Sequence, residues 1–139
     1  MSGSHVLAVI LASIAEFAVG AIWYMPLFGK QWGEIFEFQK MDKKAQKEMQ
    51  AKMGPFYGLQ LLVTVITTIV LSKLMMLVPT MSPYMLASMV WIGFVVPTQV
   101  SGVIFGGTPP QWIVRKITIQ AGGALACLLV AAAILSFFQ

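Results

Sequence analysis

The sequence predicts an all-α polytopic membrane protein, a bundle of four transmembrane helices with a short amphipathic helix in the first loop. First, the 139 residues are 58% hydrophobic and only 10% charged, with a mean hydropathy of +0.83, whereas soluble domains carry charge on about a quarter of their residues. Second, four apolar stretches each reach the length of about 20 residues that crosses the hydrocarbon core. Third, these stretches lack the alternating polarity of barrel strands, and backbone amides in lipid must bond internally, so we expect helices.

The four spans are predicted to form a single membrane domain of residues 1–139. Glycine and proline mark their ends: Gly54-Pro55 precedes the second span, and segments 79–83 and 106–110 form tight turns before the third and fourth. The predicted spans are residues 6–28, 56–78, 84–105 and 113–138.

The polar loop, residues 29–55, contains the predicted amphipathic helix. Asp42 is a candidate N-cap, and apolar residues recur at four-residue spacing from Met41 to Met53 among lysines. Such a helix is expected to lie at the headgroup level; docking to a protein partner is the alternative. The residues predicted to contact lipid headgroups are Lys43, Lys44, Lys47, Arg115 and Lys116.

Basic residues gather on one side of the predicted membrane. Six lysines lie between Lys30 and Lys52, and Arg115-Lys116 lie at the start of the fourth span, whereas Lys73 is alone near the opposite side. The positive-inside rule therefore predicts a multi-pass protein of the cell (inner) membrane, with this side cytoplasmic and both termini extracytoplasmic.

Glu16 is the one acidic residue inside an apolar stretch. It lies near the middle of the first span, where an ionisable group costs about 2.5–3.5 kcal/mol to insert, so it is a candidate functional residue. Ser13, Gly20 and Trp23 share its helical face, at offsets of three, four and seven. Two interpretations stay open: Glu16 handles a proton or a cation, or it only hydrogen-bonds a neighbouring helix.

Polar residues on the other spans are candidate partners of Glu16. On the second span, Gln60, Thr64 and Thr67 or Thr68 follow helical spacing, and in the third span two polar residues follow a proline expected to kink the helix. Packing or bonding to their own helix is the alternative role. The candidate intramembrane polar site comprises Glu16, Ser13, Trp23, Gln60, Thr64, Thr98, Gln99 and Gln120.

Small residues predict close helix packing, because they let two backbones approach. The pattern does not distinguish a contact within the chain from one between subunits. The predicted packing residues are Gly20, Gly102, Gly122, Gly123 and Ala126.

No motif predicts catalysis, a metal or a cofactor. The sequence has one cysteine and one histidine, no Ser-His-Asp or Cys-His set, and no glycine-rich phosphate loop. We therefore expect no enzyme, no metal site and no cofactor. The net charge of +4 lies in one loop and at helix ends, which is typical of membrane anchoring and disfavours nucleic acid as a partner.

Residues 20–32, GAIWYMPLFGKQW, resemble the Gly-x-x-Trp-Tyr-x-x-Leu-Phe-Gly-x-x-Trp motif of the domain of unknown function 1761 family. The resemblance extends through all four predicted helices. It implies a small, mainly bacterial four-helix membrane protein with a polar first loop, but no mechanism. Small multidrug resistance transporters are similar in placement only, with four helices and a glutamate in the first that binds protons and cationic drugs within a dimer.

Two classes of function follow from these observations. The favoured one is a structural or accessory membrane subunit that assembles through polar and small-residue helix faces, as a homo-oligomer or with a membrane partner in the lipid bilayer. The alternative is a small proton- or cation-coupled transporter or channel that uses Glu16.

Overall fold

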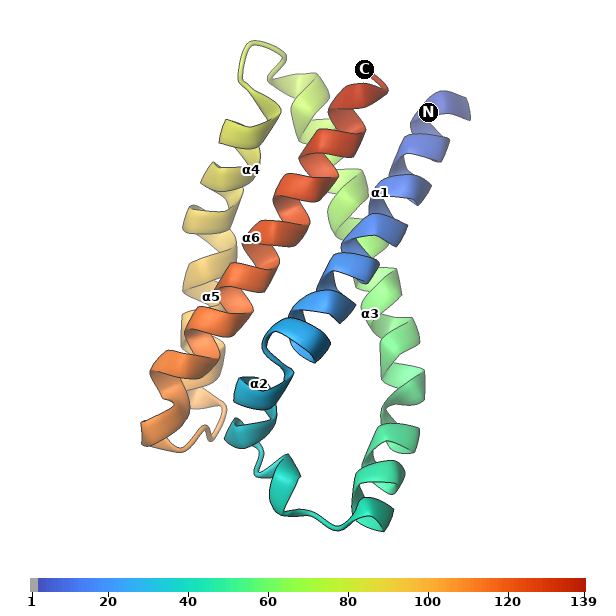
Figure 1. The fold of residues 1–139 in the computed structure, drawn as a ribbon. Coiled ribbons are helices and arrows are strands. Elements are labelled where there is room, and N and C mark those ends of the chain that lie inside the picture. The colour runs from blue at the N-terminus through green and yellow to red at the C-terminus, as the bar shows by residue number, and fades with distance from the viewer. Residues whose placement is uncertain (1–2) are drawn as a thin grey trace.

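The computed structural model describes residues 3–139, and its helices run up and down in a bundle (Figure 1). Within these residues, the α-helices are α1 (Gly3–Ile22), α2 (Gly29–Ile35), α3 (Lys43–Leu77), α4 (Pro83–Val90), α5 (Val96–Phe105) and α6 (Ile113–Phe137). Short 3-10 turns lie at Phe38–Lys40 and Pro110–Trp112.

The described residues contain four helical spans that are long and apolar enough to cross a membrane. They confirm the predicted fold class and a multi-pass membrane protein. The spans are Gly3–Leu27, Lys43–Leu77, Pro83–Phe105 and Pro110–Phe137.

Two π-helical segments lie within these spans. Trp23–Leu27 extends α1 and contains Pro26, and Trp91–Val95 joins α4 to α5 just before Pro97. A proline removes one backbone donor and crowds the preceding turn, and a π bulge is one way in which a helix accommodates this. The predicted kink of the third span therefore takes the form of a π segment.

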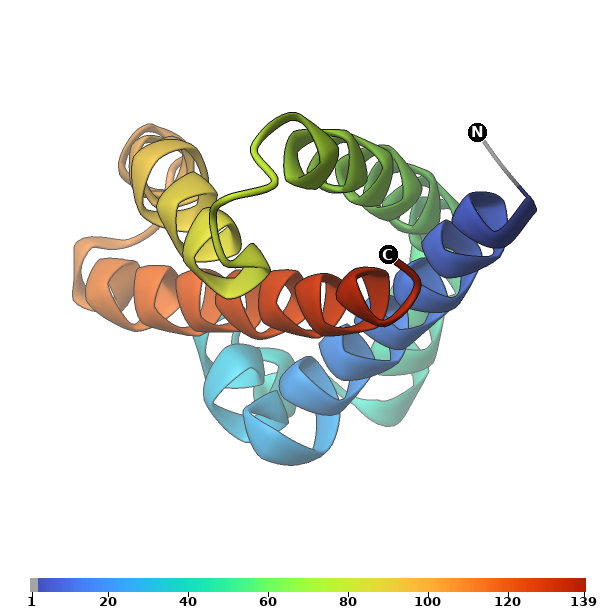
Figure 2. The same cartoon turned by 90° about the horizontal axis from the view of Figure 1, so that it is seen from above.

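Helix α6 is the central element and packs against α1, α4 and α5, while α3 packs mainly on α1 (Figure 2). The core between them is rich in alanine, which lets helix backbones approach closely. Four alanines are completely buried: Ala12, Ala87, Ala131 and Ala132. Larger buried side chains, such as Leu71 of α3 and Leu128 of α6, fill the space around them.

Both described ends of the chain lie at the same end of the bundle as the turn between α3 and α4 (Figure 1). The first loop and the turn between α5 and α6 lie at the opposite end. The six loop lysines and the pair Arg115-Lys116 therefore belong to one end of the molecule.

The second span differs from the prediction, because it does not begin after Gly54-Pro55. Asp42 Oδ1 accepts a hydrogen bond from the Ala45 backbone N–H at 2.7 Å, and the helix that starts there runs without interruption for 35 residues, with Pro55 inside it. The residues around Pro55 are exposed, so the carbonyl that loses its partner can be solvated. The predicted amphipathic segment is thus the first part of α3, and the short helix in the first loop is α2.

Candidate functional site between α1, α3 and α6

Glu16 is buried between three helices, with only 4% of its surface exposed. The hydroxyl of Thr68 on α3 donates a hydrogen bond to Glu16 Oε2. On the other side, Cys127 Sγ of α6 donates to the Glu16 backbone carbonyl at 3.4 Å. Glu16 therefore links α1 to both helices that pack against it.

The Thr68 hydroxyl lies within hydrogen-bond distance of two acceptors. Besides Glu16 Oε2, it reaches the Thr64 carbonyl of its own helix at 2.7 Å. A hydroxyl has one hydrogen to donate but can also accept. A Glu16 carboxylate would accept from Thr68, whereas a protonated Glu16 could donate to Thr68 while Thr68 donates to Thr64. The contact between α1 and α3 can thus persist in either protonation state.

Further buried polar side chains lie on α1 and α3. Ser13, one turn before Glu16, is 2% exposed, and its hydroxyl has no partner within residues 3–139. His5 Nε2 lies 2.8 Å from the Ser72 hydroxyl, and Ser72 is itself buried. Buried polar groups therefore extend from Glu16 toward the end of the bundle that holds the termini.

The structure does not bring all predicted polar residues to Glu16. Gln60 is exposed on α3, and its carbonyl accepts from Thr64 at 2.8 Å. Thr98 is exposed on α5 and donates to the Phe94 carbonyl at 2.7 Å. Both threonines thus bond their own helices, as threonines in membrane helices commonly do.

Two predicted glutamines lie on α5 and α6. Gln99, on α5, has a buried Oε1 without a partner in the described part of the chain. Gln120 is half-buried on α6. Within residues 3–139, no hydrogen bond joins Gln99 or Gln120 to Glu16, so these glutamines do not form a shared site with it.

Two tryptophans bind α6 through its backbone. The Trp23 indole N–H donates to the Ile119 carbonyl at 2.8 Å, and the Trp91 indole N–H donates to the Ala121 carbonyl at 2.7 Å. Each tryptophan is the first residue of a π segment. The two π segments thus coincide with the points at which α1 and α4 are attached to α6.

The glycines of α6 make room for Trp23. A Cβ atom at Gly122 would lie 2.8 Å from Trp23 Cζ2, and one at Gly123 would lie 2.9 Å from Trp23 Cδ1. These distances are shorter than real Cβ contacts, so the indole occupies the space that a side chain would need. Within the chain, Gly122 and Gly123 are therefore packed against the Trp23 ring. This contact explains the two glycines without the close approach of a second helix backbone.

The other small residues have different surroundings. Nothing lies within 4 Å of a Cβ position at Gly20 or Gly102, so neither forms a close helix contact within the described chain. Ala126 is half-buried on α6, next to Cys127. Packing between copies at Gly20 and Gly102 stays a prediction.

Sequence reasoning did not single out Thr68 and missed Trp91. The spacing left Thr67 and Thr68 undecided, although Ser72, four residues after Thr68 on the same helical face, was a signal in favour of Thr68. Trp91 could not be found from spacing, because its partner is a backbone carbonyl on another helix.

The aromatic residues of the sequence motif, together with Phe36, form two groups of ring contacts. The ring centroids of Trp23 and Phe28 lie 4.8 Å apart, those of Tyr24 and Trp32 also 4.8 Å, and those of Trp32 and Phe36 5.2 Å. These contacts fold α2 back against the end of α1 at the membrane boundary, where such rings are favoured.

The basic residues predicted to contact lipid fall into two groups. Lys43, Lys44 and Lys47 are exposed in the first turns of α3. Arg115 Nη1 instead lies 2.6 Å from Glu34 Oε2 of α2, which ties α2 to α6. Lys116 Nζ lies 5.1 Å from the ring centroid of Phe36.

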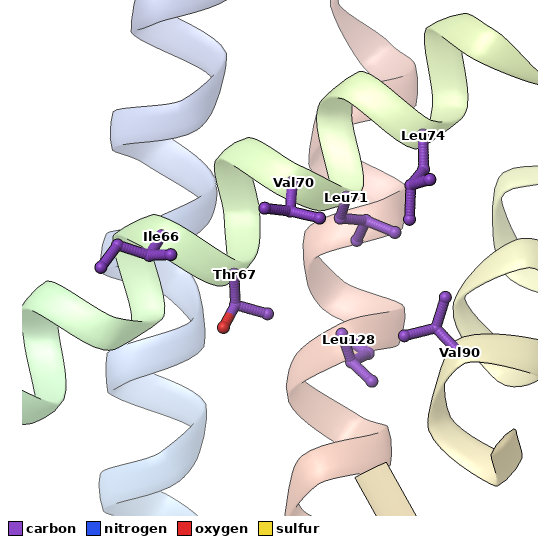
Figure 3. A pocket seen from close by; sticks show the side chains of 7 residues that line it. All are labelled: Ile66, Thr67, Val70, Leu71, Leu74, Val90 and Leu128. Carbon is purple, nitrogen blue, oxygen red and sulfur yellow. The ribbon is translucent and has the colours of Figure 1, made fainter. Parts of the chain in front are cut away.

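A separate pocket of about 220 Å³ opens between α3, α4 and α6 (Figure 3). Its lining is hydrocarbon apart from Thr67, whose hydroxyl already donates to the Val63 carbonyl at 2.9 Å. It therefore offers a single polar group to a ligand, a hydroxyl whose one hydrogen is already used within its own helix. Residues 3–139 also bring together no three His, Cys, Asp or Glu side chains that could hold a metal ion.

The sequence matches the family described as "Protein of unknown function (DUF1761)" over residues 7–136. No curated protein and no solved structure matches the sequence. The resemblance found at residues 20–32 is thereby confirmed along nearly the whole chain, and this small integral membrane protein belongs to the DUF1761 family.

Proposed function

We propose that the protein is a small structural or accessory subunit of the cell (inner) membrane, without enzyme activity, and that Glu16 serves its assembly. The observation that carries this proposal is the use of the Glu16 carboxylate in a bond between helices, to Thr68. Its backbone carbonyl accepts from a third helix through Cys127. An intramembrane carboxylate that is partnered in this way specifies which helices pair.

We propose that assembly continues beyond one chain, as a homo-oligomer or with a membrane partner. The open backbone surfaces at Gly20 and Gly102 support this, because another helix could approach them closely. The charge distribution supports an orientation with the lysine-rich end in the cytoplasm and both termini outside.

The test compares Glu16→Gln with Glu16→Ala in the purified protein in lipid. Glutamine keeps the shape and can both donate to and accept from Thr68, so we expect the fold and oligomeric state to be retained. Alanine removes the bond, and we expect the free energy of unfolding to fall by about 0.6–1.7 kcal/mol, the range of inter-helix bonds in membranes. Thr68→Val in the Glu16→Ala background should cost little more, because the bond is already lost.

Equal stability of Glu16→Ala and the wild type would contradict the assembly role. So would a Glu16→Gln protein that folds but no longer assembles, since hydrogen bonding alone would then be insufficient. Unfolding in mixed micelles and light scattering of the protein in detergent provide these measurements.

A second candidate is a small proton- or cation-coupled transporter or channel. It is favoured by the buried Ser13 hydroxyl, one turn before Glu16, which has no partner within residues 3–139, and by the polar contact of His5 with Ser72 between α1 and α3. The Thr68 hydroxyl can also serve both protonation states of Glu16. This candidate predicts that Glu16→Gln folds normally but loses proton or cation flux in vesicles, whereas the assembly role predicts no flux in either protein.

A further inference from the structure

A second cavity lies at the lysine-rich end of the molecule, which is the end of the bundle opposite to the termini (Figure 1). It is an open cavity of about 180 Å³, lined by the end of α2 (Ile35 and Phe36), the turn at residues 106–109, and Lys116 of α6. The turn joins two membrane spans that end at Phe105 and begin at Pro110. The cavity is therefore at the membrane boundary, where the headgroups of phospholipids lie.

The lining includes the positively charged side chain of Lys116, which no carboxylate neutralises within residues 3–139. The adjacent residue Arg115 is paired with Glu34 at 2.6 Å, and Glu37 is paired with Lys40. Lys116 forms no ion pair in the described chain and instead lies over the Phe36 ring at 5.1 Å. An aromatic ring orients an ammonium group but does not cancel its charge, so an anion in the cavity would be attracted.

Thr108 supplies a second polar group. It lines the cavity, and its hydroxyl is shielded from solvent without a hydrogen-bond partner in residues 3–139. Buried hydroxyls are normally bonded, and one that is not calls for an explanation by an additional partner. A ligand oxygen would be such a partner, because a hydroxyl can donate to it.

The backbone of the same turn has a conformation suited to anions. Gly106 has φ −90° and ψ 15°, and Gly107 follows with φ +79°, in the left-handed region that favours glycine. A right-handed residue followed by a left-handed one makes successive N–H groups converge, which is the geometry of anion-binding nests. Lys116, Thr108 and both glycines of this turn line the cavity.

We propose that this cavity binds the phosphate group of a phospholipid headgroup. A phosphate has several acceptor oxygens, which Lys116, Thr108 and the 106–108 backbone can share, and it is abundant at this depth of a membrane. The site does not involve Glu16, so it stands or falls independently of the proposed function.

The test uses the full chain in detergent micelles, titrated with phosphatidylglycerol, with the lipid-bound fraction measured by native mass spectrometry. Lys116→Gln removes a charge-assisted bond, and we expect affinity to fall by about tenfold or more. Thr108→Val should weaken binding by about two- to tenfold. Its thermal midpoint should not fall, because the hydroxyl has no protein partner to lose.

The controls separate a built site from general charge attraction. Lys73→Gln makes the same charge change at an exposed position of α3 near the opposite end of the molecule and should leave affinity unchanged, and Lys116→Arg should retain binding. Equal losses in Lys73→Gln and Lys116→Gln, or no loss in either cavity variant, would overturn the proposal.

Two further ligands test which part of the lipid is bound. Diacylglycerol has the same chains without phosphate and should not bind at this site; binding as tight as that of phosphatidylglycerol would overturn the phosphate assignment. Inorganic phosphate should compete only weakly, and competition with equal affinity would overturn the assignment to a lipid in favour of free phosphate.

Discussion

At the residue scale, Glu16 and Trp23 attach α1 to its neighbours by two different chemistries. Glu16 uses a side-chain bond to Thr68, whereas Trp23 uses its indole N–H on the Ile119 carbonyl and places its ring over two glycines. The ring contact requires the absence of a Cβ atom. The glycines of α6 are therefore as much a part of this attachment as the tryptophan.

Gly123→Ala tests that attachment. The added Cβ would lie 2.9 Å from Trp23 Cδ1 and 3.1 Å from Nε1, so the indole must shift and its bond to α6 is strained. We expect the free energy of unfolding in detergent to fall by about 1–3 kcal/mol, as for overpacked cores.

Gly58→Ala on α3 is the matched control, because nothing lies within 4 Å of that Cβ position and no subunit contact is proposed there. Alanine is the better helix former, so we expect a change of no more than about 1 kcal/mol, in the stabilising direction. A larger loss in Gly58→Ala than in Gly123→Ala would contradict this placement.

At the element scale, α3 is longer than a membrane requires. Its 35 residues correspond to about 52 Å of helix, against a hydrocarbon core of about 30 Å. The surplus lies at the lysine-rich end, before Pro55. The proposed contacts of Lys43, Lys44 and Lys47 with headgroups therefore come from a helix that continues the span.

The continuity of α3 can be measured with two spin labels, at Lys47 and Ile66, in a Cys127→Ala background. An unbroken helix places these two Cα atoms about 28 Å apart, because 19 residues each rise 1.5 Å. A clearly shorter distance would indicate a bend at Gly54-Pro55 and a separate interfacial helix, as the sequence pattern alone suggested.

The four spans could be predicted from the sequence, whereas the continuity of α3 through Pro55 could not. Hydropathy predicts the four spans because lipid imposes length and apolar composition on each one separately. Hydropathy could not decide whether the helix breaks at Pro55 or continues through it, because this depends on whether the carbonyl that loses its partner can be solvated. The same limit applies to the site. Glu16 can be recognised in the sequence because a carboxyl group is costly to place in lipid. The roles of Thr68 and Trp91 instead depend on how the second and third spans are rotated about their axes, which the sequence does not reveal.

At the scale of the whole molecule, the bundle separates its charges. The lysine-rich loop, Arg115 and Lys116 lie at one end, and both described chain ends lie at the other (Figure 1). With single cysteines placed at Lys44 and at Gln139 in a Cys127→Ala background, we expect a membrane-impermeant maleimide added to intact cells to label only residue 139. Labelling of residue 44 alone would contradict the proposed orientation.

The central claim is that Glu16 holds helices together and does not exchange its proton or bind cations as part of a cycle. Infrared absorption of its carboxyl group in the lipid-embedded protein tests this claim most directly, with Glu16→Gln as the blank. The assembly account predicts one carboxyl band that stays unchanged as candidate cations are varied and across the pH range in which the protein remains folded. A band that changes reversibly with pH near neutrality and shifts with cations would contradict it and establish Glu16 as a coupled transport site.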